Sequence, residues 1–188
     1  MGVMIASGTD VVSFLKEQHQ QVKDGFREVI TAKGEARTKA FAQLRRLMAI
    51  HETAEEEIVH PVARRNLPDG NAIVDARLRE EKEAKRLLGV LETLDVESAE
   101  FEERIHMLMK AIVEHAESEE REEFARLASM LDQSKLERMR RAVKFAESIA
   151  PTRPHSGMES ATINALGGPF VAMIDRARDA ITGMKTKH

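Results

Sequence analysis

The sequence predicts an all-α protein: an antiparallel up-down-up-down four-helix bundle with an additional C-terminal helical arm. Apolar residues recur with helical spacing along most of the 188 residues, and strand-like alternation never continues for more than a few positions. Short connections separate four long periodic segments, and short connections between long helices favour antiparallel neighbours. The composition agrees, because 32% charged and 42% hydrophobic residues are typical of amphipathic helices that pack around a core.

The first helix is expected over residues 9–30, beginning at about Thr9 or Asp10, with Thr9 as the candidate N-cap. Lys33 and Gly34 are expected to end it, because glycine is common just past the end of a helix. The apolar face of this helix comprises five residues: Val11, Leu15, Val22, Phe26 and Val29.

The next three helices are expected over residues 35–66, 72–94 and 99–131. The segment 67–71 has the composition of a turn. Residues 95–98 form a short connection in which Ser98 is the candidate cap of the following helix. Each of the three helices has an apolar face, so all four can share one core.

The chain is expected to divide after residue 132. Residues 8–132 form the bundle with the functional site, and residues 133–188 form a C-terminal helical extension. Ser134 and Glu137 are spaced as in a capping box, which predicts a fifth helix to about Ile149. A last helix is expected to be interrupted at 167–169 and to end at about residue 181. The extension is expected to pack on the bundle or on a partner, where it could form a homodimer.

The composition argues against several classes of function. The net charge of -3 argues against a general nucleic-acid binder. The absence of cysteine excludes disulfides, thiol catalysis and cysteine-ligated metal sites, and the absence of tyrosine excludes a tyrosyl radical. No apolar run approaches the ~20 residues of a membrane span, and the first residues lack the pattern of a signal peptide, so a cytoplasmic location is expected.

Three of the seven histidines fall on apolar helix faces. At about 100° per residue, His19 falls inside the apolar stripe of the first helix. His51 and Glu55 lie at the centre of the apolar face of the second helix, and His115 and Glu119 have the same placement on the fourth. A single histidine on such a face is most often a core residue bonded to a carbonyl or a carboxylate. Here, however, two His-x-x-x-Glu pairs converge with a third histidine.

These convergent pairs predict a metal site. Residues four apart on a helix lie one above the other, so each pair can bind a single ion. Buried carboxylates without a cation cost several kcal/mol each, and a metal ion removes that penalty. On the third helix, Glu81 lies in the apolar stripe and Lys82 lies at its edge. Glu81 is therefore the predicted ligand, whereas Lys82 and Lys85 are expected in solvent or as a nearby positive charge.

The predicted ligands are three imidazoles and three carboxylates: His19, His51, Glu55, Glu81, His115 and Glu119. Six ligands exceed the needs of one structural zinc ion and suit two iron or manganese ions bridged by carboxylates. Glu52 is a further candidate that could turn inward. His60 is expected about 160° from the centre of the stripe, opposite the site, and is kept as an additional candidate because Pro61 can kink the helix. Three histidines are expected at the surface: His106, His155 and His188.

The order and spacing of these residues resemble the hemerythrin-like, HHE cation-binding family. The resemblance covers about residues 8–130 and is carried by three segments: Phe14-Leu15-Lys16-Glu17-Gln18-His19, His51-Glu52-Thr53-Ala54-Glu55 and His115-Ala116-Glu117-Ser118-Glu119-Glu120. That family is a four-helix bundle with a non-heme di-iron centre, so the resemblance implies two iron ions joined by oxo and carboxylate bridges. It implies ligands at five positions: His19, His51, Glu55, His115 and Glu119. Segments 150–155 and 165–169 look similar to the tail of actinobacterial hemerythrin-like proteins.

The third helix departs from the family pattern. The family usually has Glu-His there, whereas this chain has Glu80-Glu81-Lys82. The loss of one histidine argues against reversible oxygen carriage. Because anionic oxygen ligands favour ferric iron, the leading hypothesis is a di-iron protein that reacts with O₂ or H₂O₂, including catalase-like peroxide removal under oxidative stress.

Two other functions stay open from the sequence. One is a non-enzymatic protein that binds or senses O₂, NO or iron, and the other is an interaction bundle without a metal. The ligand set does not decide between an enzyme and a binding protein, because one fold and one site can support several reactions. No catalytic residue is assigned.

Overall fold

The structure is a computed structural model that describes residues 9–149. The predictions for the last interrupted helix, the tail resemblance, His155 and His188 lie outside the described residues. Within residues 9–149 the secondary structure is helical and contains no strand. The prediction of an all-α fold is confirmed.

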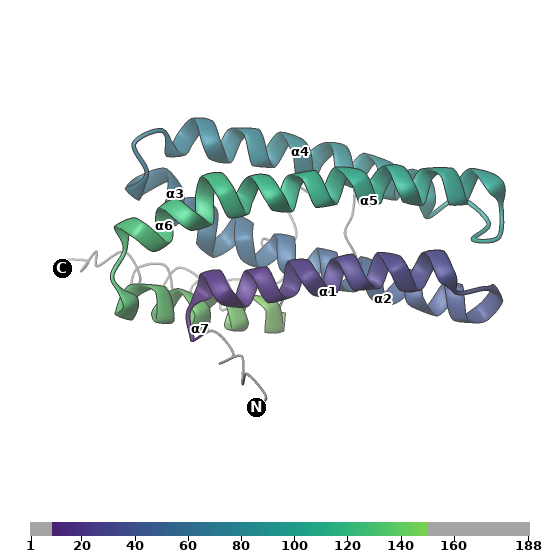
Figure 1. The fold of residues 1–188 in the computed structure, drawn as a ribbon, viewed down its shortest axis with the longest axis horizontal. Helices are drawn as coiled ribbons and strands as arrows, with labels where there is room; N and C mark the ends of the chain where they lie inside the picture. Colours follow the sequence, from purple (N-terminus) through teal and green to yellow (C-terminus); the bar gives the residue numbers. More distant parts are fainter. Residues whose placement is uncertain (1–8, 150–188) are drawn as a thin grey trace, which may run out of the picture.

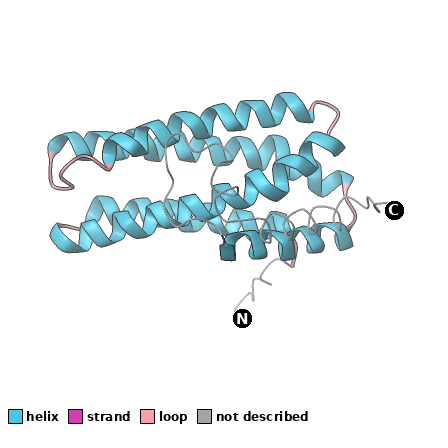
Figure 2. Cartoon of the chain, turned by 180° about the vertical axis from the view of Figure 1, so that it is seen from behind, coloured by secondary structure: helices cyan, strands magenta, loops and turns pink. Residues whose placement is uncertain are grey.

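Four long helices form the body of the bundle: α1 (Val11–Thr31), α2 (Gly34–Ala54), α4 (Gly70–Leu91) and α5 (Ala99–Glu119). Figure 1 shows them side by side along the long axis of the molecule, joined by short connections at the two ends. The opposite view in Figure 2 shows the same arrangement. α1 packs against α2 and α5, and α4 packs against α5. Short connections between long helices therefore give the up-and-down order that the sequence predicts.

Two of the long helices continue through a π-helical turn into a short α-helix. α2 continues through the π-helical segment η1 (Glu55–Val59) into α3 (His60–Asn66). α5 continues in the same way through a second π-helical segment and a last short helix: η2 (Glu120–Phe124) and α6 (Ala125–Met130). The helices predicted over 35–66 and 99–131 are thus continuous helical runs, but each contains a π turn that the hydrophobic spacing does not indicate.

The helix ends show which local predictions were right. Ser98 caps α5, because its hydroxyl accepts a hydrogen bond from the Phe101 N–H at 3.1 Å. The predicted cap of α1 was wrong by one residue: the carboxylate of Asp10, rather than the side chain of Thr9, accepts from the Ser13 N–H. An Asp at this position bonds the first turn as well as Thr does, and composition alone does not separate them.

The last described helix begins two residues earlier than predicted. α7 (Gln133–Ile149) starts before Ser134, and the Asp132 carboxylate accepts from the Lys135 N–H at 2.8 Å. The predicted capping box between Ser134 and Glu137 is therefore not the start of this helix. The helix continues to Ile149, the last described residue, so its predicted end stays a prediction.

Glycine is required where α3 meets α4. A Cβ atom at Gly70 would lie 2.3 Å from the Ala63 carbonyl oxygen, which is closer than any side chain tolerates. Leu67 ends α3 in an extended conformation, as expected for a residue before proline. These two local rules place α4 directly against α3.

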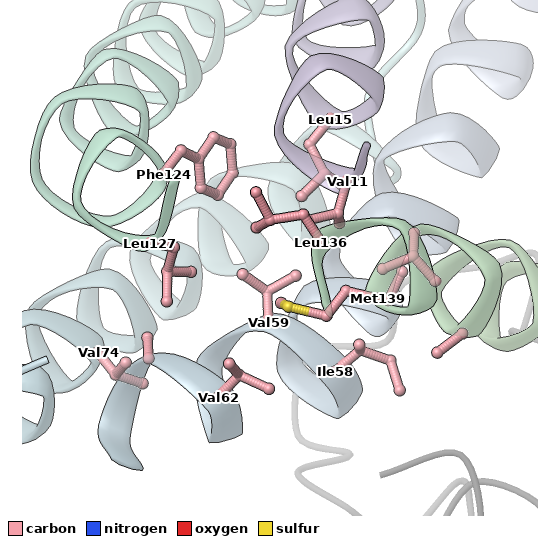
Figure 3. Close-up of a cluster of buried hydrophobic side chains, with 14 of the residues drawn as sticks. Val11, Leu15, Ile58, Val59, Val62, Val74, Phe124, Leu127, Leu136 and Met139 are labelled. Atoms are coloured by element: carbon pink, nitrogen blue, oxygen red, sulfur yellow. The ribbon is translucent and has the colours of Figure 1, made fainter. Parts of the chain in front are cut away.

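The apolar core has two separate parts. One lies toward the α1–α2 and α4–α5 connections and contains Phe26, Phe41 and Phe101. The other lies at the α3, α6 and α7 end, where Figure 3 shows Leu136 and Met139 of α7 pointing toward Val11 and Val59. Each fully buried large apolar side chain contributes about 1.5–3 kcal/mol, so both parts stabilise the bundle.

α7 completes the second part of the core. Its apolar residues are buried against α1, α2 and η1, and Met139 and Val143 have no exposed surface. The expectation that this segment packs on the bundle agrees with the position of α7, whereas the boundary at residue 132 and the segment beyond 149 stay predictions. Among the described residues, no helix is long and apolar enough to cross a membrane.

Candidate metal centre

A layer of buried polar side chains separates the two parts of the apolar core. His19 comes from α1, His51 from α2, Glu81 from α4 and Glu119 from α5, so each of the four long helices contributes at least one. The buried histidines and acids of this layer are His19, His51, Glu52, Glu55, His60, Glu81, His115, Glu119 and Glu123. The bundle therefore brings all six residues predicted as ligands into its interior.

Three groups of these side chains offer nitrogen and oxygen atoms within 4.8 Å of one another. The groups are His19, His51, Glu55 and Glu119; His60, Glu119 and Glu123; and Glu81, His115 and Glu119. Glu119 belongs to all three groups. One carboxylate that is shared by three groups is suited to bridging two metal ions.

The imidazole Nε2 atoms point toward two central carboxylates. His51 Nε2 lies 3.2 Å from Glu55 Oε2, and His19 Nε2 lies 3.3 Å from Glu119 Oε2. His115 Nε2 lies 3.3 Å from the other Glu119 oxygen, Oε1. The two oxygens of Glu119 thus face histidines from different helices, α1 for Oε2 and α5 itself for Oε1.

Glu55 and Glu119 are buried carboxylates that face imidazole nitrogens without forming regular hydrogen bonds to them. Both side chains are 0% exposed, and none of their four carboxylate oxygens has a hydrogen-bond partner. A buried ionised carboxylate without a partner is strongly destabilising in a medium of low dielectric constant. The imidazole nitrogens and carboxylate oxygens that surround this position are the ligands that iron and manganese accept, so the residues fit a metal centre.

Each inward-facing imidazole is held from behind through its Nδ1 atom. His19 Nδ1 lies 2.9 Å from Glu120 Oε1, and His115 Nδ1 lies 2.9 Å from Glu80 Oε2. His51 Nδ1 lies 2.9 Å from the amide oxygen of Gln18. An acceptor behind Nδ1 keeps the proton on that nitrogen and leaves Nε2 free, which is the usual support of a metal-binding histidine.

His60 is arranged in the same way, which corrects the prediction that it faces away from the site. It is 2% exposed, its Nδ1 lies 3.0 Å from Glu123 Oε1, and its Nε2 lies 3.1 Å from Glu81 Oε1. The π turn η1 adds one residue to the helical repeat, so every later side chain rotates back by about 100°. This rotation moves His60 from about 160° to about 60° from the stripe centre. The cause is the π turn, not a kink at Pro61.

Sequence reasoning missed four residues that support the histidines. They are Gln18, Glu80, Glu120 and Glu123, each of which bonds the Nδ1 atom of one imidazole. Glu123 lies in the second π turn, and its side chain is fully buried. A sequence signal existed for Glu120 and Glu123. They belong to the acid-rich segment 119–123, which follows a histidine predicted to face the core, so some of its acids can be expected inside the bundle.

Lys85 forms ion pairs with three acidic residues at one side of the layer. Its Nζ atom lies 2.7 Å from Glu56, 3.3 Å from Glu52 and 3.6 Å from Glu81. Glu52 therefore has a cation partner and belongs to none of the three groups formed by the described residues. The expectation of a nearby positive charge holds for Lys85, whereas Lys82 is exposed.

The titration behaviour of the histidines differs across the layer. Burial and the neighbouring His19 lower the pKa of His51 to about 3. Burial alone would lower the pKa of His60, but its hydrogen bonds to Glu123 and Glu81 raise it to about 10. Burial and the nearby Glu119 carboxylate raise the pKa of Glu55 well above its usual value. The layer as a whole contains more acidic groups than its histidines neutralise, which favours a bound cation.

A small cavity adjoins the histidines. Its volume is about 20 Å³, and it lies between α1, α2 and α5 against His19, His51 and His115. Apolar side chains such as Val22, Met48 and Ile112 form its remaining walls, and Lys23 and Glu52 also line it. This volume holds at least one water-sized molecule next to the imidazoles. His106 is exposed, as predicted.

The fold and this layer define a helical-bundle protein with an interior suited to a cation, and comparison with known proteins gives the family. The family model described as hemerythrin HHE cation binding domain matches residues 10–127. Because this match covers more than half of the chain, the protein belongs to the hemerythrin HHE cation-binding family. The family resemblance inferred from the sequence is confirmed, as is metal binding as the general property of the domain.

Two individual proteins are similar to this chain. A curated protein named DNA nickase from Nostoc sp. is 24% identical over 154 residues, which cover 79% of this chain and 43% of that protein. The chain thus spans less than half the length of this relative. A crystal structure of an HHE cation binding domain-containing protein from Mycobacterium kansasii has a TM-score of 0.55, with 19% identity over 91% of this chain and 88% of that chain. At this identity, the likeness shows the fold alone.

Proposed function

We propose that this protein binds two iron ions and that the di-iron centre reacts with H₂O₂ or O₂, with catalase-like removal of peroxide as its activity. The observation that carries the proposal is the pair of fully buried carboxylates, Glu55 and Glu119, whose four oxygens have no hydrogen-bond partner and face imidazoles. Two cations would satisfy these oxygens, with the imidazoles as further ligands.

The ligands divide into two sets around Glu119. His19, His51 and Glu55 would hold the first ion, and His60, Glu81 and His115 would hold the second. Glu119 would contact both, in agreement with its place in all three groups of side chains. In this assignment Glu123 orients His60, since it bonds Nδ1 as Glu120 does for His19. His60 thereby supplies the imidazole that α4 lacks.

The donor set favours iron, with manganese as the alternative. Imidazole suits iron, and carboxylate suits iron and manganese, whereas a set of ligands without sulfur argues against sites for copper(I) or structural zinc. Four imidazoles and three carboxylates also exceed the four ligands of a tetrahedral zinc site. The anionic carboxylates favour the ferric state, which opposes release of unchanged O₂.

A pair of iron ions would supply the two electrons that interconvert peroxide with water or with O₂. Two molecules of H₂O₂ then give one O₂ and two H₂O, so the net reaction needs no external reductant. The protein residues would hold the ions close together, and the adjoining cavity of about 20 Å³ has room only for a small molecule such as O₂, H₂O₂ or NO. Lys85, through Glu52 and Glu81, keeps the carboxylates on one side fixed.

The test is metal analysis followed by peroxide turnover. We expect about two irons per chain, which is the number that the two ligand sets would hold. Added H₂O₂ should evolve O₂ over many turnovers, and Glu55→Ala should abolish this evolution. Glu103→Ala, which removes an exposed acid from α5, is the control. A single stoichiometric reaction with peroxide, together with reversible binding of O₂ or NO, would instead support a binding or sensing protein.

The name of the Nostoc relative is a reason to assay DNA as well. No action on DNA is proposed, because this chain spans only 43% of that protein and has a net charge of -3. Incubation with supercoiled plasmid in the absence of peroxide should leave the plasmid intact. A cytoplasmic location and a homodimer through the C-terminal arm of residues 133–188 also stay proposals.

A further inference from the structure

His51 differs from the other three inward-facing histidines in the group behind it. The Nδ1 atoms of His19, His60 and His115 face carboxylates directly, whereas His51 Nδ1 faces the neutral amide of Gln18 at 2.9 Å. The amide nitrogen of Gln18 lies 2.5 Å from Glu147 Oε1. A carboxylate therefore reaches His51 as well, but through an intervening amide and from α7, which follows the family match of residues 10–127.

The direction of this chain of hydrogen bonds follows from which atoms can donate. An ionised carboxylate only accepts, so the NH₂ group of Gln18 must face Glu147 and its oxygen must face His51. That oxygen also only accepts, so the His51 nitrogen that faces it must carry the proton. Nδ1 is then protonated and Nε2 has a free lone pair directed toward Glu55.

Without an acceptor at residue 147, the direction is no longer fixed. The Gln18 amide can turn over by about 180°, because its oxygen and nitrogen have almost the same size and shape. Its NH₂ group would then donate to His51 Nδ1. That arrangement favours the opposite tautomer, with the proton on Nε2, and a protonated Nε2 cannot bind a metal ion.

We propose that Glu147 is a positioning residue for the metal centre: through Gln18 it fixes the tautomer of His51, and α7 is thereby part of the metal site. The inference rests on the proposed function only in taking His51 Nε2 as a ligand atom. Glu147 itself follows Ala146, which is buried in the apolar core, so the packing of α7 holds the carboxylate in place. The residue acts on the metal only through Gln18 and His51.

The most informative variant is Glu147→Gln, which preserves size and hydrogen bonding but removes the fixed direction. Two facing amides can pair either way round, so both orientations of Gln18 become available. In metal-free protein, nitrogen-15 NMR of the imidazole reports the tautomer of His51. We expect the Nδ1-protonated form alone in the unaltered protein and a mixture of both tautomers in Glu147→Gln.

A double variant that exchanges the amide and the carboxylate between residues 18 and 147 tests whether the tautomer of His51 can be restored. In Gln18→Glu combined with Glu147→Gln, the carboxylate faces His51 directly and accepts from Nδ1, while the amide introduced at residue 147 donates to that carboxylate. We expect this double variant to restore the single Nδ1-protonated tautomer. A role of Glu147 in packing alone predicts no such rescue, because the double variant has the same side chains on α7 as the single one.

Metal affinity is the second readout, measured with iron(II) by competition with a chelator. Loss of a group that orients a metal ligand costs about 10–100-fold, and we expect about tenfold for Glu147→Gln, with recovery in the double variant. Glu137→Gln is the matched control, since it neutralises another carboxylate on α7, one that accepts a hydrogen bond from Gln133 on the same helix. It should change neither readout.

The results separate this inference from the proposed function. A pure Nδ1-protonated His51 and unchanged iron affinity in Glu147→Gln would overturn the role of Glu147. A tautomer mixture in that variant, with rescue in the double variant, supports the role even if the unaltered protein shows no peroxide turnover. If the tautomers respond as expected but the protein binds no iron or manganese, the proposed metal function fails and the positioning of His51 stands.

Discussion

The two halves of the proposed site reach the bundle interior in different ways. His19 and His51 lie on α-helices with an uninterrupted repeat, so a helical wheel places them correctly. His60 depends on the π turn η1, which rotates it inward by about 100°. In the proposed site, a change of helical repeat on the second helical run would thus supply the imidazole that α4 lacks.

The two halves also differ in charge. In the first half His51 has its pKa lowered to about 3, so it is neutral near pH 7 and ready to bind a cation. In the second half, burial would lower the pKa of His115, but the carboxylates of Glu119 and Glu80 raise it to about 10, as those around His60 do for that residue. Without metal, the second half therefore neutralises its carboxylates with protonated imidazoles.

The largest effect is expected at the residue that joins the two halves. Glu119→Gln removes the one carboxylate that belongs to all three groups of side chains. We expect loss of both ions and iron binding weakened by more than about 100-fold, because even loss of a group that only orients a ligand costs about 10–100-fold. Metal analysis after dialysis measures this, with Glu117→Gln on the solvent side of α5 as control. Two tightly bound ions in Glu119→Gln would contradict the bridging role.

A smaller effect is expected when only one half is changed. His51→Ala should remove the first ion, and His60→Ala should remove or weaken the second by about 10–100-fold. His106→Ala is the control, since this exposed histidine lies on α5 away from the layer. If His60→Ala retains both ions with unchanged affinity while His51→Ala does not, the π turn has no part in metal binding.

The α4 ligand tests the second half from another helix. Glu81→Ala should change metal content or the near-ultraviolet spectrum, because Glu81 is buried and contacts His60 Nε2 at 3.1 Å. Lys82→Ala, at the next residue, should leave both unchanged because Lys82 is exposed. The opposite result would show that α4 presents a different residue to the site.

The smallest expected effect is on the stability of the metal-free protein. Its pH dependence should show the difference in histidine charge between the two halves. The folded pKa of His60 lies above its unfolded value of about 6.5, so its contribution to stability is complete below about pH 6.5 and is lost as pH rises through about 10. His51 has the opposite sign: its folded pKa is lower, so stability is lost as pH falls from about 6.5 toward 3.

Urea unfolding in the presence of EDTA measures how the free energy of unfolding changes with pH in these two ranges. His60→Gln should flatten the loss of unfolding free energy between about pH 7 and 10, whereas His51→Gln should flatten the loss at acidic pH. The two variants serve as controls for each other. Identical pH profiles for both would contradict the difference in charge between the halves.

Most of the fold could be predicted from the sequence because local rules govern it. Hydrophobic spacing and the 67–71 turn indicate four helices, and Ser98 marks a helix start that the structure confirms. The same rules failed between Thr9 and Asp10, and between Ser134 and Asp132, because polar residues one or two positions apart can cap a helix equally well.

The candidate site could be predicted only in part, because a helical wheel holds only as far as the regular α-helical repeat continues. His51 with Glu55 and His115 with Glu119 keep a four-residue spacing as each π turn begins, so the wheel applies to them. A π turn has no simple sequence signature, although residues of both turns, such as Ile58 and Phe124, are buried in the apolar core. Gln18 and Glu147 are 129 residues apart, and only the tertiary packing of α7 brings them together.

The central claim is that two metal ions lie on either side of Glu119, one in each half. Anomalous diffraction at the iron edge from crystals of iron-loaded protein tests it most directly. We predict two iron peaks, one at bonding distance from His19 and His51, and the other at bonding distance from His60 and His115. A single peak at full occupancy, or a second peak that His60 does not contact, would contradict the account.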